Sequence, residues 1–222
     1  MPSMFYKVKK LIHPLQIDAN WEKLPWKDIQ SALIQNHMGQ KPFHFPKAEV
    51  KIAYDDHAIY AIFRVEDRYV RAVASEHQDS VAMDSCVEFF FTPNSDISKG
   101  YFNLEMNCGG TMRFHFRKAP GRDSIIIPKN ECKTIRSVHS LPNIIDPEIQ
   151  EPVTWTVEYR LPISLINKYC HISPPAPCVT WRANFYKCAD NTSHPHWLTW
   201  ALVDYPKPNF HLPQFFGILE FE

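Results

Sequence analysis

The sequence predicts an all-β protein: an antiparallel β-sandwich, jelly-roll-like, with one or two short helices, in a single domain over residues 1–222. Short segments in which apolar and polar residues alternate recur along the chain, which is the period of a strand with one buried face. Turn residues separate these segments, as in sandwiches and barrels. The 19 prolines against 6 glycines favour ordered loops between short strands over flexible linkers.

The first third of the chain is predicted to hold one strand and one hairpin, joined by loops. Alternating residues and turn signals place these elements. In order, they are a strand over residues 8–17, a loop with a short helical turn over 17–26, a loop over 30–47, a hairpin of 50–54 and 61–65, and a long connection over 66–80.

The clearest pattern covers residues 84–116, where two segments alternate strictly around the turn Cys108-Gly109-Gly110-Thr111. An earlier strand, 87–91, precedes this hairpin. One face of the hairpin is apolar, and a sheet with one face in the core can present the other to a ligand. The polar face carries Asn103, Glu105, Asn107, Arg113 and His115.

The rest of the chain is predicted to continue as short strands. Pro162 begins the expected helix, because proline is tolerated in a first turn. In order, the elements are weak strands over 124–127 and 134–138, a strand over 154–161, a short helix over 162–169, a rigid loop over 174–177, and strands over 181–186, 197–203 and 218–221.

Composition excludes some classes of function. Lys plus Arg and Asp plus Glu both number 24, so the basic excess of a nucleic-acid-binding surface is absent. No apolar run is long enough for a membrane span. The first residues do not have the pattern of a secretory signal, so we expect the chain as written to be cytoplasmic, or secreted if a signal was removed. The sequence gives no indication of oligomeric state.

The cysteines form no CxxC motif, which argues against a zinc ribbon or a thioredoxin-type site. Cys86 and Cys188 lie in expected strands, so we expect free, packed thiols there. Cys170 and Cys178 are candidates for a disulfide around the Pro-rich loop.

Five stretches, in this order, resemble the family-nine carbohydrate-binding modules and their sandwich-fold relatives. They are Ile17-Asp18-Ala19-Asn20-Trp21; residues 50–67, with Tyr54-Asp55-Asp56 and Val65-Glu66-Asp67; residues 84–90; residues 101–107; and residues 209–217. The resemblance implies a β-sandwich that binds sugar on or beside one sheet, with structural calcium in some members. It also implies non-catalytic binding of a mono- or oligosaccharide that supports polysaccharide breakdown.

In the best-known members of that family, two tryptophan rings clamp a terminal sugar and polar side chains hold its hydroxyls. One ring precedes the strand that matches Val87-Glu88, where this sequence has Val81-Ala82-Met83. The other precedes the final Phe-Gly, where this sequence has Phe210. The resemblance places Glu88 at a sugar-contacting acid and Glu105 at a cationic contact residue.

A sugar packs its C–H face on an aromatic ring and needs fixed donors and acceptors around its hydroxyls. From these requirements the candidate sugar-binding residues are Glu88, Glu105, Asn107, Arg113, Asn209, Phe210 and His211. The alternative is that the charged residues form cross-strand ion pairs on a solvated face and that Phe210 plugs the end of the core. We expect Trp155, Trp181 and Trp200 in the core, and Trp197 and Tyr205 nearer the surface.

Two other functions stay open. Glu88 and Glu105 are the paired carboxylates that a glycoside hydrolase or other sugar-active enzyme would use, although no catalytic residue is assigned. A haem-binding redox subunit would take its axial ligands from Met83, Met106, Met112 and His115. Calcium would suit the acidic residues Asp55-Asp56, Glu66-Asp67, Asp79 and Asp84. Another metal would suit His194, His196 and His211.

Overall fold

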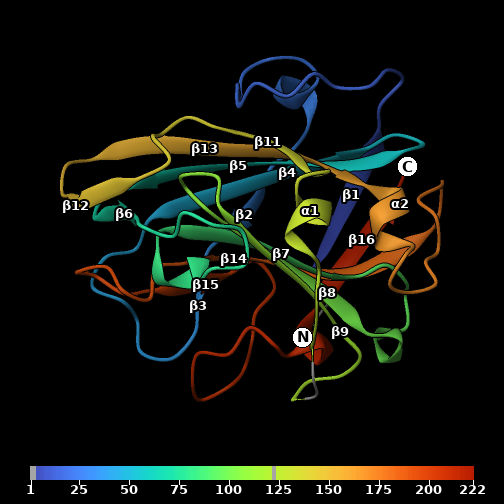
Figure 1. Cartoon of the computed structure of the whole chain (residues 1–222). Helices are drawn as coiled ribbons and strands as arrows, with labels where there is room; N and C mark the ends of the chain where they lie inside the picture. The colour runs from blue at the N-terminus through green and yellow to red at the C-terminus, as the bar shows by residue number, and fades with distance from the viewer. Residues whose placement is uncertain (1–3, 122–123) are drawn as a thin grey trace.

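Two layers of strands pack face to face around an apolar core (Figure 1). The computed structural model describes residues 4–121 and 124–222. The predicted β-sandwich is confirmed, with one exception to its antiparallel pairing. Strand β1 (Phe5–Lys10) runs parallel to its neighbours in both layers, first to β16 and then to β4. It therefore links the two sheets.

The lower layer in Figure 1 has the strand order β10-β9-β8-β7-β14-β16-β1. Two short strands continue it beside the end of β14. The strands are β7 (Cys86–Thr92), β8 (Tyr101–Asn107), β9 (Met112–Arg117), β10 (Ser124–Ile126), β14 (Thr180–Cys188) and β16 (Gly217–Phe221), continued by β15 (Trp197–Thr199) and β3 (Asn36–His37).

The upper layer has the order β1-β4-β5-β13-β11. Its strands are β4 (Lys47–Tyr54), β5 (Ala58–Asp67), β13 (Val153–Pro162) and β11 (Arg136–His139), with β2 (Ala32–Ile34) on the first half of β4. Strands β6 (Val70–Ala72) and β12 (Ile145–Ile149) form a separate pair.

The helices of the described residues are all short. Two are α-helical, as predicted, and Pro162 lies at the N-cap of the second. They are α1 (Lys129–Cys132) and α2 (Ile163–Ile166), with 3-10 turns η1 (Trp26–Asp28), η2 (Val81–Met83), η3 (Ile97–Lys99) and η4 (Pro213–Phe215). Within the described part of the chain, none is long and apolar enough to span a membrane.

The core follows the predicted alternation. Phe89, Phe91 and Leu104 point inward and are fully buried, and the rings of Phe89 and Phe91 stack. Trp155, Trp181 and Trp200 are buried, as expected. The outward side chains of β7 and β8 are buried too, because residues of the 203–216 segment pack over Phe90 and Tyr186. The polar face of this sheet is therefore not solvated.

Several predicted boundaries are wrong. The first strand covers Phe5–Lys10 rather than 8–17. Residues 15 and 17 instead pack as loop against the Trp21 and Trp26 cluster. Glu158 holds this loop by accepting hydrogen bonds from the amides of Asp18 and Ala19. Sequence periodicity carries no signal for such a long-range contact.

Short edge strands were also missed. Residues 30–47 contain β2 and β3, and residues 66–80 contain β6. Helix α1 and strand β12 lie on either side of the weak strand expected over 134–138, where no element was assigned. Each is too short to show a period. The strand expected over 134–138 covers Arg136–His139, and that expected over 197–203 ends at Thr199. Cys170 and Cys178 are free rather than paired, whereas Cys86 and Cys188 are free and buried as expected.

Candidate functional site

The outward side chains of four neighbouring strands form a row across the lower sheet. The register places Arg113 of β9 opposite Glu105 of β8, Glu105 opposite Glu88 of β7, and Glu88 opposite Tyr186 of β14. Because strand side chains alternate, these four lie on the face away from the core.

A cavity of about 350 Å³ opens over this row. Its floor comes from β7, β8 and β9, and its walls come from the segments that follow β14 and β15. All the predicted sugar-binding residues except Asn107 line it: Glu88, Glu105, Arg113, Asn209, Phe210 and His211. The fold thus brings together residues that lie more than a hundred positions apart, and their role in binding stays a prediction.

Asn107 does not line the cavity, which corrects the sequence-based expectation. Its amide nitrogen donates a hydrogen bond to Asp84 Oδ2 at 2.8 Å, and its side-chain oxygen accepts one from the Thr111 amide at 2.9 Å. Asn107 is fully buried and fixes the turn between β8 and β9. Its alternation in the sequence is correct, but it lies one row beyond the cavity.

The two carboxyl groups of the floor are both buried. Glu88 is 2% exposed and Glu105 is 6% exposed. Glu88 Oε1 accepts a hydrogen bond from the Cys188 thiol at 3.1 Å, and Glu105 Oε1 accepts one from Asn103 Nδ2 at 2.7 Å. Among the described residues, neither carboxylate forms an ion pair within 4.0 Å. The alternative of cross-strand ion pairs on a solvated face is therefore not what the structure adopts.

Burial is the main cause of raised pKa values in this cavity. It raises the pKa of Glu88, and the neighbouring Cys188 and Glu105 raise it further. It also raises the pKa of Glu105, although Arg113 and Asn103 act in the opposite direction. Both carboxyl groups thus keep unused hydrogen-bonding capacity toward the cavity.

Two half-buried rings contribute to the walls. Phe210 stacks on Tyr186 with ring centroids 4.0 Å apart and an interplanar angle of 14°, and the Tyr186 hydroxyl donates to the Phe210 carbonyl at 3.2 Å. Trp197 Nε1 donates to Asp190 Oδ1 at 2.8 Å. Phe210 is therefore a supported wall of the cavity rather than a plug inside the core.

Cationic and neutral donors complete the lining. Arg113 and Arg117 project from the same face of β9 as His115. Arg117 Nε and His115 Nδ1 are buried and have no hydrogen-bond partner in the part of the chain that the structure describes. Burial lowers the pKa of His211 to about 3, and the two arginines add to this effect, so the ring is neutral. Buried polar atoms without partners are rare in folded proteins and often mark a place for water or ligand.

The sequence prediction missed several residues of the cavity. They are Ala82, Phe90, Arg117, Cys188, Asp190, Trp197 and Pro208. Arg117 follows Arg113 by two strand periods, so alternation alone would have found it. Trp197 was expected near the surface. It occupies neither of the two sequence positions at which the resemblance places a clamp ring. Ala82 stands where the resemblance places the first ring.

A family model for carbohydrate-binding family 9 matches residues 15–221. The chain belongs to carbohydrate-binding family 9. This confirms the resemblance stated above. A search of curated proteins gives no significant match.

Solved structures agree with the family 9 fold. A candidate carbohydrate-binding protein of Bacteroides uniformis ATCC 8492 is 27% identical over all of both chains, with a TM-score of 0.88. A family 9 module of Caldicellulosiruptor kristjanssonii in complex with glucose is 13% identical, over 97% of this chain and 95% of that one, with a TM-score of 0.65. The same kind of module in complex with cellotriose is 14% identical, over 99% and 94%, with a TM-score of 0.67.

The haem ligands proposed from the sequence do not converge in this family 9 domain. Met106 and Met112 lie opposite each other on the core face and are buried. His115 projects from the other face of β9, and Met83 is exposed. The four side chains therefore share no pocket.

The acidic residues and histidines that were expected to bind metal are also placed differently in the structure. Asp55 accepts hydrogen bonds from two turn amides and from the Tyr60 hydroxyl, which is a structural role. Asp84 holds the amides of residues 73 and 74. His194 and His196 lie beside His44, whereas His211 lines the cavity, so these histidines do not form one ligand set.

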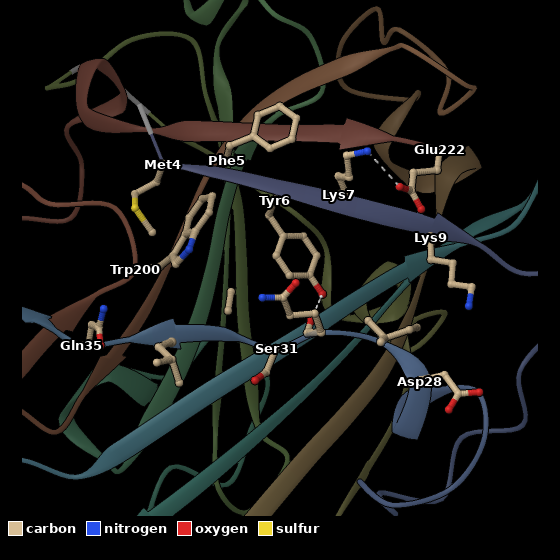
Figure 2. Close-up of a pocket in the computed structure, with 14 residues that line it drawn as sticks. Met4, Phe5, Tyr6, Lys7, Lys9, Asp28, Ser31, Gln35, Trp200 and Glu222 are labelled. Carbon is tan, nitrogen blue, oxygen red and sulfur yellow. Dashed lines mark hydrogen bonds and ion pairs between the residues drawn. The ribbon is translucent and has the colours of Figure 1, made fainter. Parts of the chain in front are cut away.

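A second hollow, of about 590 Å³, lies where β1 separates from β2 (Figure 2). Lys7 pairs with Glu222 at 3.4 Å at its rim. The Tyr6 hydroxyl donates to the Gln30 carbonyl at 2.7 Å. The lining of this hollow includes none of the predicted sugar-binding residues, so it is a weaker candidate than the cavity over Glu88 and Glu105.

Proposed function

We propose that this family 9 domain binds a short saccharide in the cavity over Glu88 and Glu105, without catalysing a reaction on it, in support of polysaccharide breakdown. One observation carries the proposal. Two buried carboxyl groups that form no ion pair with any described residue lie opposite each other at the floor of a cavity whose wall includes the supported ring of Phe210.

The lining supplies the two kinds of contact that a sugar needs. Phe210 and Trp197 offer apolar ring surface to its C–H face. Glu88 and Glu105 offer oxygens to its hydroxyl groups, and Arg113 offers donors. Asn209 positions the wall, since its Oδ1 accepts a hydrogen bond from the His211 amide at 2.9 Å.

The size of the cavity favours a small ligand. Its volume of about 350 Å³ is at the low end for small-molecule sites. The related modules that share the fold are described in complex with glucose and with cellotriose. We therefore propose that one end of a mono- or oligosaccharide enters the cavity and that the rest of the chain extends outside.

A hydrolytic use of the same carboxyl groups has less support. A retaining or inverting glycosidase needs one protonated and one ionised carboxyl group. Burial raises the pKa of both Glu88 and Glu105, so neither side chain is identified as the ionised partner. Their buried oxygens suit hydrogen bonding to sugar hydroxyl groups.

Isothermal titration calorimetry with glucose and cellotriose tests the proposal. We expect saturable binding, and a loss of roughly 10-fold or more in affinity for Phe210→Ala, because a stacked ring contributes about 1 kcal/mol beyond its area. Phe43→Ala is the matched control, since Phe43 is exposed and outside the cavity. No binding to any member of a glycan array, or equal affinities for the two variants, would refute this site.

A further inference from the structure

Two thiols and a carboxyl group meet at the floor of the cavity. Cys86 of β7 lies opposite Cys188 of β14, and Glu88 is two residues from Cys86 on the same strand face. One ligand atom from each residue lies within 4.8 Å of the other two. Within residues 4–121 and 124–222, this is the only group of three or more potential ligands at such spacing.

The cluster has the donor set of a zinc-type site. A tetrahedral Zn²⁺ ion about 2.3 Å from each sulfur separates two thiolates by roughly 3.8 Å. The three ligand atoms are therefore within about 1 Å of suitable positions. Two sulfurs select a thiophilic ion over calcium or magnesium, which prefer oxygen.

The buried cation nearest in sequence does not compete for these three ligand atoms. Lys187, next in sequence to Cys188, points to the other face of the sheet and pairs with Asp67 at 3.3 Å. An ion that binds here replaces the protons of the two thiols and the carboxyl group, because coordinating thiols and carboxyls bind in their deprotonated forms.

We propose that Cys86, Cys188 and Glu88 bind one thiophilic divalent cation, with a free coordination position toward the cavity. Access to this position exists because Glu88 and Cys188 line the cavity while Cys86 lies beneath it. Three protein ligands with one open position are the pattern of an exchangeable zinc site rather than a closed structural one. The proposal does not depend on sugar binding, and the two are measured separately.

Cobalt(II) titration of the chelator-treated, reduced protein tests the proposal. We expect a sulfur-to-cobalt charge-transfer band that saturates at one equivalent and disappears when Zn²⁺ is added. Cys86→Ser and Cys188→Ser should each weaken binding by at least about 100-fold, since even outer-shell changes cost 10–100-fold. Cys108→Ser and Cys132→Ser are matched controls, because these buried cysteines lie outside the cluster, and they should keep the band.

A second measurement avoids variants that fold poorly. In the unmodified protein loaded with one equivalent of Zn²⁺, the X-ray absorption spectrum of the zinc should show two sulfur ligands. Absence of the band in correctly folded protein, or a band that persists in both cluster variants, overturns the proposal. So does a zinc absorption spectrum without sulfur ligands. Sugar binding by the metal-free protein does not affect this test, because calorimetry measures sugar binding and the cobalt band measures metal binding.

Discussion

Two buried acidic regions of this domain have opposite surroundings. Asp67 lies 2.7 Å from His44 Nε2 and 3.3 Å from the buried ammonium of Lys187. Glu88 and Glu105 are equally buried, yet among the described residues neither has an ion-pair partner. The first region has every partner that a buried charge needs, whereas the second keeps its hydrogen-bonding capacity for something else.

The same contrast appears in the pKa values. Burial alone would raise the pKa of Asp67, but Lys187 and His44 outweigh it and the pKa is lowered. Burial raises the pKa of Glu88 and no cation opposes it strongly. Lys187 and Cys188 are consecutive residues of β14, so their side chains lie on opposite faces of the sheet. Lys187 therefore contacts the first region, and Cys188 contacts the second. A buried carboxyl group is thus informative about ligand binding only when its partners are known.

The largest expected effect comes from removing the cation of the first region. Lys187→Met removes the buried ammonium group beside Asp67 and leaves His44 as its remaining ion-pair partner, so we expect a loss of about 3–5 kcal/mol in the free energy of unfolding. Urea unfolding followed by circular dichroism measures it. Lys7→Met, at an exposed ion pair, is the control and should be close to neutral. If both variants have the same stability, Asp67 is not held by Lys187.

Substitutions of two asparagines distinguish a structural side chain from one that contributes to binding. Asn107→Ala removes hydrogen bonds to Asp84 and Thr111, so we expect a loss of about 2–3 kcal/mol in unfolding free energy. Asn209→Ala, in the cavity wall, should change stability by about 0.5 kcal/mol or less but weaken sugar binding several-fold. Urea unfolding and calorimetry on both variants check this. A large loss of sugar affinity and a small loss of stability for Asn107→Ala would show that Asn107 belongs to the binding site.

Alternation along β7, β8 and β9 predicted the sheet face and most of the cavity floor from sequence alone. Asn107 was included in the candidate site because alternation reports which face a residue occupies, not how far along the strand the cavity extends. Asp190 and Cys188 were missed because they reach the cavity through strand pairing between segments a hundred residues apart. The partners of Asp67 were equally hidden, since they come from residues 44 and 187.

Replacing a carboxyl group of the cavity should weaken saccharide binding and have little effect on the stability of the fold. Glu105→Gln keeps an acceptor for Asn103 and removes a buried carboxyl group, so we expect unfolding free energy to change by less than about 1 kcal/mol. Saccharide affinity should fall roughly 10-fold, or about 1.4 kcal/mol. Calorimetry and urea unfolding on the same preparation measure both quantities. A stability loss as large as that of Lys187→Met would mean that Glu105 is a structural charge.

The smallest expected effect is a pH dependence of stability in the first region. Burial lowers the pKa of His196 to about 3, and Lys187 lowers it further, while Asp67 acts in the opposite direction. Below pH 6.5 the unfolded chain therefore takes up a proton that the folded protein does not, and stability falls as the pH falls. From pH 6.5 to 5.5 this contributes about 1 kcal/mol.

His196→Gln should remove this part of the pH dependence, because glutamine does not titrate. Asp67 does not contribute in the same interval, since its pKa lies below its ordinary value and its carboxylate stays ionised. Urea unfolding at pH 6.5 and 5.5 on both proteins measures the difference. An equal change in unfolding free energy between the two pH values in both proteins would show that His196 is charged beside Asp67. The first region would then hold a second cation, and its contrast with the cavity would be stronger than the geometry indicates.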